Sequence, residues 1–286
     1  MKSTNAPEGE VKKEYQRPFL KWTGSKMRVL PEIEKYLPAA PSRLIEPFVG
    51  CGALFINSGA ERYLLNDINS DLINLYKVLQ SDAARLIDGA AKFFTPENNA
   101  KEPYLALRQR FNLSRDPYER SILFVYLNRH CFNGLCRYNS KGVFNVPAGS
   151  YATVSFQRQW MQEFANKLRL ADLYNEDFAA TFARANKGDV IYADPPFVGQ
   201  HKDTHIFAYH GKVFDAQAHQ RLADVAKETA QRGVTVLISN HDTPFTREIY
   251  HPAEIHSFAV TRFVSAKASQ RGAAQELLAL FKPAVA

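Results

Sequence analysis

The chain has 286 residues, of which 45% are hydrophobic and 23% charged, and its formal net charge is +7. This length allows a substantial buried core, and the composition excludes a disordered or fibrous protein. The longest uninterrupted apolar run, at residues 122–127, is far too short to cross a membrane. Three cysteines are too few for a disulfide framework, so we expect a reduced, cytoplasmic protein, and we expect a monomer in solution.

The chain opens with a polar, charge-rich segment at residues 1–16, which we interpret as a disordered leader because it lacks the apolar stretch of a signal peptide. Strands are then predicted at residues 43–48, 63–66, 189–193, 234–239, 255–262 and 276–281. Helical patterns occupy residues 54–60, 71–79 and 215–232. This alternation predicts a doubly wound α/β fold, with a mostly parallel sheet and helices on both faces.

Residues 101–170 interrupt the alternation with helices predicted at 104–111, 117–129 and 155–170 and a long loop at 130–153. This segment holds 11 basic and four acidic side chains, whereas the rest of the chain holds 25 of each. The imbalance indicates a polyanionic partner, although solvated basic helix faces would give the same count. The loop has no acidic residue and carries aromatic rings and asparagines, which favours a nucleic-acid groove.

A glycine-bearing turn, EPFVGCG at residues 46–52, follows the first predicted strand. Glycine lets the backbone turn sharply and approach a ligand closely, and this is where doubly wound sheets bind nucleotides. Asp67 ends the next strand 17 residues after Gly50, a position that suits a carboxylate for a ribose diol. The third glycine of a dinucleotide fingerprint is missing, so a turn that only packs a helix on a strand is an equal alternative.

A second motif, DPPF at residues 194–197, follows the apolar strand predicted at 189–193. Two successive prolines cannot continue a strand ladder, and they leave rigid carbonyl oxygens beside a carboxylate and an aromatic ring. Such a group can accept both hydrogens of an exocyclic amine while the ring stacks on its heterocycle. The motif therefore predicts a receptor for a flipped base, the alternative being a buried turn.

Together the two motifs resemble those of the S-adenosylmethionine-dependent DNA N6-adenine methyltransferases. The segments 19–26, 127–139 and 238–242 make the order similar to that of the Dam-type subgroup (D12 class, alpha group), from about residue 17 to 283. The resemblance implies a seven-stranded Rossmann-like methyltransferase sheet, with a catalytic domain at 17–100 and 171–286 and an inserted DNA-recognition domain at 101–170. It also implies S-adenosylmethionine as cofactor, double-stranded DNA as partner, no metal, and adenine methylation in GATC.

The resemblance and the motifs together assign the site residues. The target adenine and its chemistry would be handled by Asp194, Pro195, Pro196 and Phe197. The cofactor would be bound by Trp22, Lys26, Glu46, Phe48, Gly50, Gly52, Asp67, Asp177, Phe178 and Asp194. The DNA would be contacted by Lys21, Arg129, Phe132, Asn133, Leu135, Arg137, Asn139, Lys141 and Pro147.

Two positions depart from the family pattern. The motif ends in Phe197 where the commonest form has Tyr, and Ser150 stands where close relatives carry a basic residue, often Arg, that helps to read the last base pair. We therefore expect specificity at that base pair to be relaxed.

Other readings stay open at this stage. The same planar-amine chemistry would serve a methyltransferase of RNA or of a protein amide, and a DNA-binding homologue without catalysis would keep the basic insert. A nicotinamide oxidoreductase is disfavoured by the missing glycine. Cytosine-C5 methylation would need a Pro-Cys nucleophile, which none of the three cysteines provides. We expect His201, His205 and His210 to lie in a polar loop rather than to bind a metal.

Overall fold

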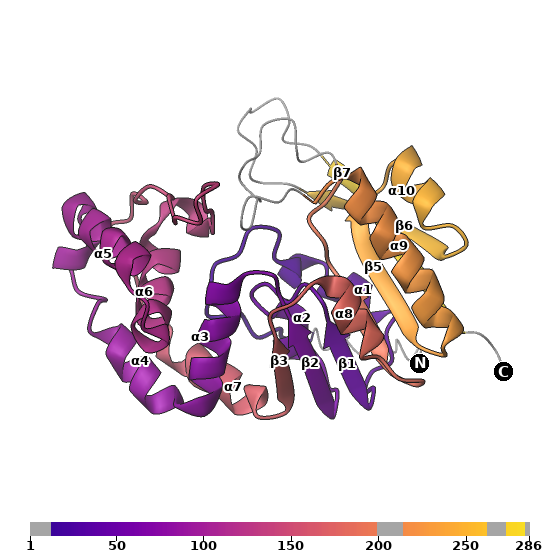
Figure 1. Ribbon diagram of the computed structural model, residues 1–286, viewed down its shortest axis with the longest axis horizontal. Helices are drawn as coiled ribbons and strands as arrows, with labels where there is room; N and C mark the ends of the chain where they lie inside the picture. The colour runs from indigo at the N-terminus through magenta and orange to yellow at the C-terminus, as the bar shows by residue number, and fades with distance from the viewer. Residues whose placement is uncertain (1–12, 199–213, 262–272, 284–286) are drawn as a thin grey trace, which may run out of the picture.

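A seven-stranded sheet in the order β3-β2-β1-β4-β5-β7-β6 forms the centre of the protein (Figure 1). The computed structural model describes residues 13–198, 214–261 and 273–283. The strands are β1 (Arg43–Glu46), β2 (Arg62–Asn66), β3 (Ala171–Tyr174), β4 (Val190–Ala193), β5 (Thr235–His241), β6 (Glu254–Thr261) and β7 (Ala273–Phe281). The first five are parallel, and β7 runs antiparallel between β5 and β6. The predicted mostly parallel α/β fold is confirmed.

The main corrections to the strand predictions concern β3, β1, β5 and β7, which begins at Ala273 rather than at residue 276. Strand β3 was not predicted: it has four residues, lies at the edge of the sheet and is only partly buried, so its apolar signal is weak. Strand β1 ends at Glu46, because Pro47 has no N–H for the ladder. Strand β5 continues to His241, where its last residues pair with β7.

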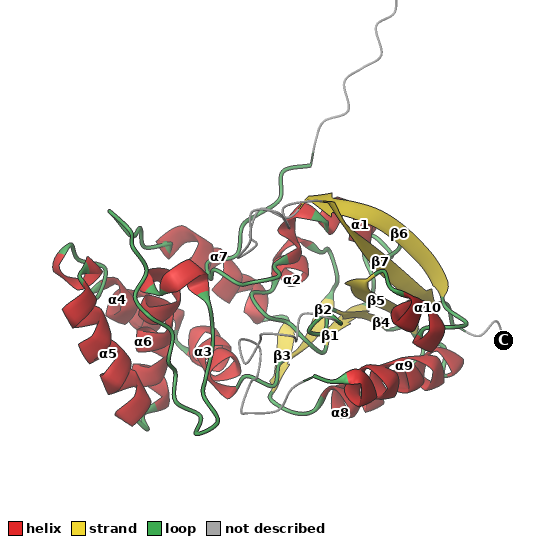
Figure 2. Cartoon of the chain, turned by 90° about the horizontal axis from the view of Figure 1, so that it is seen from above, coloured by secondary structure: helices red, strands yellow, loops and turns green. Residues whose placement is uncertain are grey.

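Alternate residues of each strand enter two separate cores, one on each face of the sheet. Figure 2 shows α1 (Leu30–Glu34), α2 (Ala53–Asn57) and α7 (Arg158–Leu168) on one side. On the other side lie α8 (Phe178–Ala183), α9 (Ala216–Gln231) and, near the far end, α10 (Pro244–Ile249). Because both faces are covered, the central strands are apolar throughout, as doubly wound folds require.

A group of helices extends from one end of the sheet (Figure 1). It contains α3 (Ser70–Ser81), α4 (Ala83–Ala91), α5 (Lys101–Leu113) and α6 (Pro117–His130). Short 3-10 turns occur at Lys26–Arg28, at Glu97–Asn99 between α4 and α5, and at Phe132–Gly134 after α6. The apolar run at 122–127 is the buried middle of α6. One core runs from the sheet into α6 and α7, so the domain boundaries at 101 and 170 stay a prediction.

Helix boundaries moved by a few residues from those predicted. The pattern at 54–60 forms α2 at Ala53–Asn57, and the pattern at 155–170 starts only at Arg158, after its N-cap Gln157. Helices α1, α4, α8 and α10 were not predicted, and most of them have only five or six residues. Such short helices show too few turns for a 3.6-residue period to stand out.

The predicted long loop is irregular but folds back on itself. Isolated bridges join Cys131 to Ala148 and Tyr138 to Phe144 in antiparallel fashion. We call residues 131–151 the recognition hairpin. None of the described helices combines the length and the apolarity that crossing a membrane demands.

Candidate active site

The two motifs meet at the carboxyl ends of neighbouring parallel strands. The EPFVGCG turn follows β1 and the DPPF loop follows β4, and these strands pair with each other. From β1 the sheet continues through β2 in one direction and through β4 in the other, so the strand order reverses between them. Doubly wound sheets bind ligands at this switch point.

The turn after β1 has a backbone that only glycine adopts without strain. Gly50 and Gly52 have φ of +50° and +69°. A Cβ at Gly50 would lie 2.8 Å from the indole Nε1 of Trp22, and the Gly50 carbonyl accepts a hydrogen bond of 2.6 Å from the hydroxyl of Tyr76. The glycines therefore allow the close approach of Trp22 as well as the turn.

Asp67, at the end of β2, is tied to the same turn. Its Oδ2 accepts from the N–H of Gly50 at 3.0 Å, and its Oδ1 accepts from the N–H of Asn69 at 2.9 Å. Burial raises the pKa of Asp67 to about 6, although both N–H groups act in the opposite direction. Each oxygen keeps a lone pair that can accept from a ligand.

Asp194 is fixed in place by two donors on one oxygen. Its Oδ1 lies 2.8 Å from Nζ of Lys26 and accepts a 2.7 Å hydrogen bond from the hydroxyl of Ser239. The same Nζ lies 4.4 Å from the ring centre of Phe197 and donates to the carbonyl of Gly24. Lys26, predicted from the N-terminal segment, thus contacts two members of the DPPF motif.

The end of β5 supports the DPPF loop in a way that sequence reasoning missed. The amide oxygen of Asn240 accepts from the N–H of Val198 at 3.1 Å, and Nδ1 of His241 donates to the Val198 carbonyl at 2.6 Å. The rings of His241 and Phe197 meet edge to face at 4.9 Å. The signal was present, because polar residues directly after an apolar strand are the pattern that identified Asp194.

Glu46 differs from the other carboxyl groups of the site. It is buried, and its Oε1 has no partner among the residues that the structure describes. Burial, and then the negative charge of Asp194, raise the pKa of Glu46 to about 8, against a smaller opposing effect of Lys167. At neutral pH Glu46 is therefore mostly a neutral acid that can donate a hydrogen bond.

The aromatic part of the predicted cofactor site is assembled, but Asp177 already has partners. The ring of Phe178 lies 5.6 Å from that of Phe48, beside the turn after β1. Asp177 caps α8 by accepting from the N–H of Ala179, and its other oxygen lies 2.5 Å from Nη2 of Arg221. A ligand at Asp177 would have to share this half-exposed carboxylate.

Lys21 and Arg129, two predicted DNA contacts, form a cationic pair at the base of the recognition hairpin. Lys21 donates to the Arg129 carbonyl at 3.2 Å, and its Nζ lies 3.9 Å from the ring centre of Tyr151. Within the described ranges, neither forms an ion pair with a carboxylate, and burial lowers the pKa of both. Asn128, which was not predicted, bonds the backbone N–H and C=O of Lys21.

The hairpin exposes some predicted DNA contacts and uses others internally. The side chain of Phe132 is 49% exposed, and Asn133, Lys141 and Pro147 are exposed as well, whereas Leu135 is half-buried. Arg137 donates to the amide oxygen of Asn145 at 2.8 Å. The amide oxygen of Asn139 accepts from the N–H groups of residues 141 and 143. The carbonyl oxygens of Asn139 and Asn145 therefore stabilise the hairpin rather than face outward.

No three His, Cys, Asp or Glu side chains of the described residues lie close enough together to hold a metal ion. His201, His205 and His210 fall outside the described residues.

The chain matches the model of the D12 class N6 adenine-specific DNA methyltransferase family over residues 22–263. It is 46% identical over 269 residues to a protein of Vibrio cholerae named DNA adenine methylase, with 94% of this chain and 97% of that protein covered. An Escherichia coli protein of the same name is 43% identical over 269 residues, covering 94% and 96%. A solved rRNA methyltransferase, aviRa from Streptomyces viridochromogenes, aligns with 89% of this chain and 84% of that chain at 12% identity and a TM-score of 0.37.

Proposed function

The chain belongs to the D12 class N6 adenine-specific DNA methyltransferases, and from this membership we propose that it methylates an adenine flipped out of duplex DNA, with S-adenosylmethionine as donor. The preferred site is GATC, with reduced discrimination at the last base pair. The observation that carries the proposal is Asp194, fixed by Lys26 and Ser239 across the switch point from the glycine turn.

The residues around the turn fit S-adenosylmethionine. A side chain at Gly50 would enter the space next to Trp22, and the carboxyl group of Glu46, whose Oε1 has no partner among the described residues, adds a polar group near this turn. Gly50 and Gly52 would form the turn under the methionine part, and Trp22 and Lys26 would contact the cofactor from the N-terminal segment. Asp67 would hold the ribose hydroxyls, and Phe178 with Asp177 would receive the adenine. When bound, the cofactor supplies an electrophilic methyl group on a good leaving group.

The DPPF motif supports attack by the target amine. An exocyclic amine is a poor nucleophile because its lone pair is delocalised into the ring. Both described donors to Asp194 bind Oδ1, so Oδ2 can accept one amine hydrogen while the Pro195 carbonyl accepts the other. These contacts localise the lone pair and aim it at the methyl group, while the ring of Phe197 stacks on the base. Pro196 keeps the loop rigid, and catalysis is mainly orientation and electrostatics.

The basic insert supports duplex DNA as the substrate. Lys21 and Arg129 lie side by side without a described carboxylate partner, and the exposed ring of Phe132 can stack where the flipped base has left the helix. The exposed Asn133, Lys141 and Pro147, with Leu135, Arg137 and Asn139 beside them, would contact the bases and the backbone.

Asp194→Ala tests the mechanism. We expect methyl transfer from labelled S-adenosylmethionine to a GATC duplex to fall by about a hundredfold or more, because the acceptor for the amine is lost. DNA affinity should stay within about twofold, since the phosphate contacts lie in the insert.

Asp224→Ala is the control, because among the described residues the exposed Asp224 is seen to bond only Gln220 and Lys227 of its own helix, α9. Near-normal turnover of Asp194→Ala would refute the assigned role of the carboxylate. Methylation of RNA of the same sequence in preference to the duplex would refute the substrate.

A further inference from the structure

We propose that Asp71 is a positioning residue that fixes the recognition hairpin relative to the reaction centre and so sets the discrimination between DNA sites. The proposal rests on the proposed function, because it assumes that the hairpin reads DNA. Asp71 lies in the first turn of α3, is only 7% exposed, and belongs to neither the EPFVGCG turn nor the DPPF motif.

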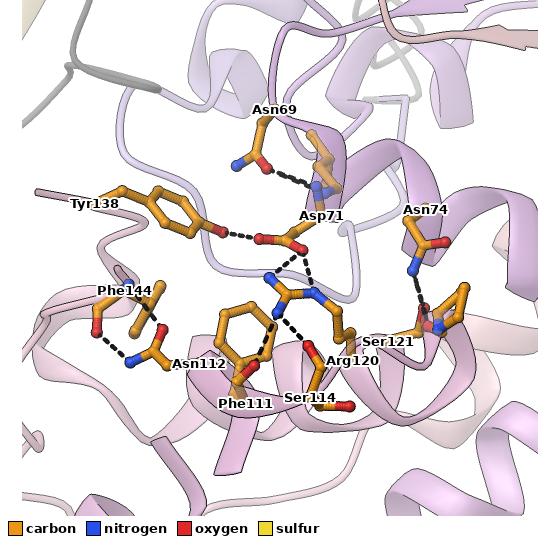
Figure 3. Close-up of polar contacts among 12 residues, drawn as sticks. Asn69, Asp71, Asn74, Phe111, Asn112, Ser114, Arg120, Ser121, Tyr138 and Phe144 are labelled. Carbon is orange, nitrogen blue, oxygen red and sulfur yellow. Dashed lines mark hydrogen bonds and ion pairs between the residues drawn. The ribbon is translucent and has the colours of Figure 1, made fainter. Parts of the chain in front are cut away.

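The carboxylate of Asp71 joins three segments (Figure 3). Its Oδ1 accepts from Nε and Nη2 of Arg120 at 2.9 and 2.7 Å, which ties α3 to α6. Its Oδ2 accepts a 2.7 Å hydrogen bond from the hydroxyl of Tyr138, in the recognition hairpin. Both oxygens are thus used, and the charge-assisted bonds are the strong kind.

Arg120 extends this connection to the corner between α5 and α6. Its Nη1 donates to the carbonyls of Phe111 and Ser114 at 2.8 and 3.0 Å, and the guanidinium lies 4.3 Å from the ring centre of Phe111. A guanidinium held on all sides offers a fixed geometry, which a flexible lysine would not. Asp71 therefore accepts the hydrogen bond from the hairpin while its own carboxylate is held by a fixed guanidinium.

Tyr138 is one of several points at which the hairpin is held, since Tyr104 and Arg108 of α5 also donate to the Val146 carbonyl at 2.8 Å. Tyr138 and Phe144 face each other across the bridge, and Asn112 of α5 bonds both backbone groups of Phe144 at 2.9 and 3.0 Å. The thiol of Cys136 accepts from the amide of Asn69 at 3.3 Å. Arg137, a predicted base contact, lies between Cys136 and Tyr138, so its backbone position follows from these attachments.

The same short segment also reaches the cofactor side of the site. The N–H of Asn69 donates to Asp67, whose other oxygen binds the glycine turn, and Asn69 caps the helix that carries Asp71. Five residues, 67–71, therefore connect the turn after β1 to the hairpin. The position of Asp71 matters because a shift of about 1 Å in the hairpin relative to the reaction centre would lower the rate of the reaction.

Tyr138→Phe is the test, because it removes one hydroxyl and keeps the ring against Phe144. We expect the ratio of kcat/KM for GATC over duplexes with one altered base pair to fall about tenfold, equivalent to about 1.4 kcal/mol. Cofactor affinity and kcat on GATC should change by less than about threefold, because neither depends on the tyrosine hydroxyl. Asp71→Asn should act in the same direction and more strongly.

Tyr126→Phe is the matched control. It removes a hydroxyl of α6 that donates to the carbonyl of Asn98, a residue outside the hairpin, at 2.7 Å. We expect it to lower the melting temperature as Tyr138→Phe does while leaving the specificity ratio unchanged. Amide hydrogen exchange in the hairpin, measured without DNA, should accelerate in Tyr138→Phe only.

Two outcomes would overturn the proposal. One is an unchanged ratio in both Tyr138→Phe and Asp71→Asn; the other is an equal loss on all duplexes, as a purely structural role would produce. If the wild type does not methylate DNA, the proposed function fails, and the exchange measurement alone still decides whether Asp71 and Tyr138 hold the hairpin.

Discussion

Asp67 illustrates how a single buried carboxyl group makes ligand binding depend on pH. Its pKa is raised to about 6 by burial, so it is neutral at pH 5 and ionised at pH 8 in the cofactor-free protein. In the proposed cofactor site a ribose hydroxyl would donate to the ionised form, so binding would favour deprotonation. Glu46, whose pKa is raised to about 8, stays mostly neutral up to pH 7.

We expect cofactor affinity to fall by about tenfold from pH 7 to pH 5, since about one unit below the pKa only a tenth of the molecules carry the charge. Calorimetric titration across this range measures the effect. In Asp67→Asn the affinity should be lower at pH 7 and nearly independent of pH. Asp88→Asn, at an exposed position of α4, should behave as the wild type. A wild-type affinity that is constant from pH 5 to 7 would contradict the role of Asp67.

Ser150, exposed at the end of the recognition hairpin, is the second residue with a measurable consequence. An arginine fork can bond O6 and N7 of guanine together, but the short hydroxyl of serine cannot. We expect Ser150→Arg to increase discrimination at the last base pair by about 1–3 kcal/mol. Competition among oligonucleotides that carry each of the four final base pairs measures this discrimination. If the wild type already rejects the three altered sites by about a thousandfold, roughly 4 kcal/mol, another residue reads that base pair.

At the scale of elements, the site is made by the ends of strands. Strands β1, β2, β4 and β5 each deliver a turn or a polar side chain to the same edge of the sheet, because parallel strands share their carboxyl ends there. The turns after these strands require backbone conformations that a strand does not contain, and the positive φ of Gly50 is the clearest example.

Gly50→Ala should weaken cofactor binding by about tenfold or more, equivalent to at least about 1.4 kcal/mol, because the new methyl group would displace Trp22. Gly188→Ala is the control, since Gly188 has φ of +91° with open space around it, at the amino end of β4. Both variants should lose about 1–2 kcal/mol of stability from backbone strain, measured by denaturant unfolding. Equal cofactor affinities in the two variants would exclude a close approach at Gly50.

At the scale of the whole molecule, charge is divided unequally. Residues 101–170 carry an excess of seven positive charges, whereas the rest of the chain is balanced. Within this insert Lys141 is exposed in the turn of the hairpin, and Lys21 of the N-terminal segment lies beside Arg129. Binding to duplex DNA should therefore release counterions and weaken steeply with salt.

Lys141→Gln should lower the slope of log affinity against log salt by about 0.9, as expected for one lost phosphate contact. Lys187 lies in the exposed turn before β4, at the amino ends of the parallel strands and so opposite the candidate active site. Lys187→Gln should therefore leave the slope unchanged. Fluorescence anisotropy between about 50 and 200 mM salt measures both. If both variants reduce the slope equally, the DNA is bound by overall charge and not by the hairpin.

Much of this protein could be predicted from its sequence, because the decisive signals are local. The central strands are apolar since both faces are covered, and a short run of such residues identifies them without knowledge of their neighbours. The DPPF motif, the glycine turn and Asp67 each directly follow or end such a strand, and the family resemblance assigned them to one site. The edge strand β3 was not predicted, because a partly buried strand shows no clear run of apolar residues.

Only the tertiary structure decided which side chains hold these motifs in place. Ser239 reaches Asp194 from 45 positions away, Tyr138 reaches Asp71 from 67, and Asn128 brackets Lys21 from 107. Hydrophobic periodicity has a range of a few residues and carries no information on such partners. They are brought together by the order of strands and the packing of helices, and a hydrogen bond forms only after those long-range contacts are made.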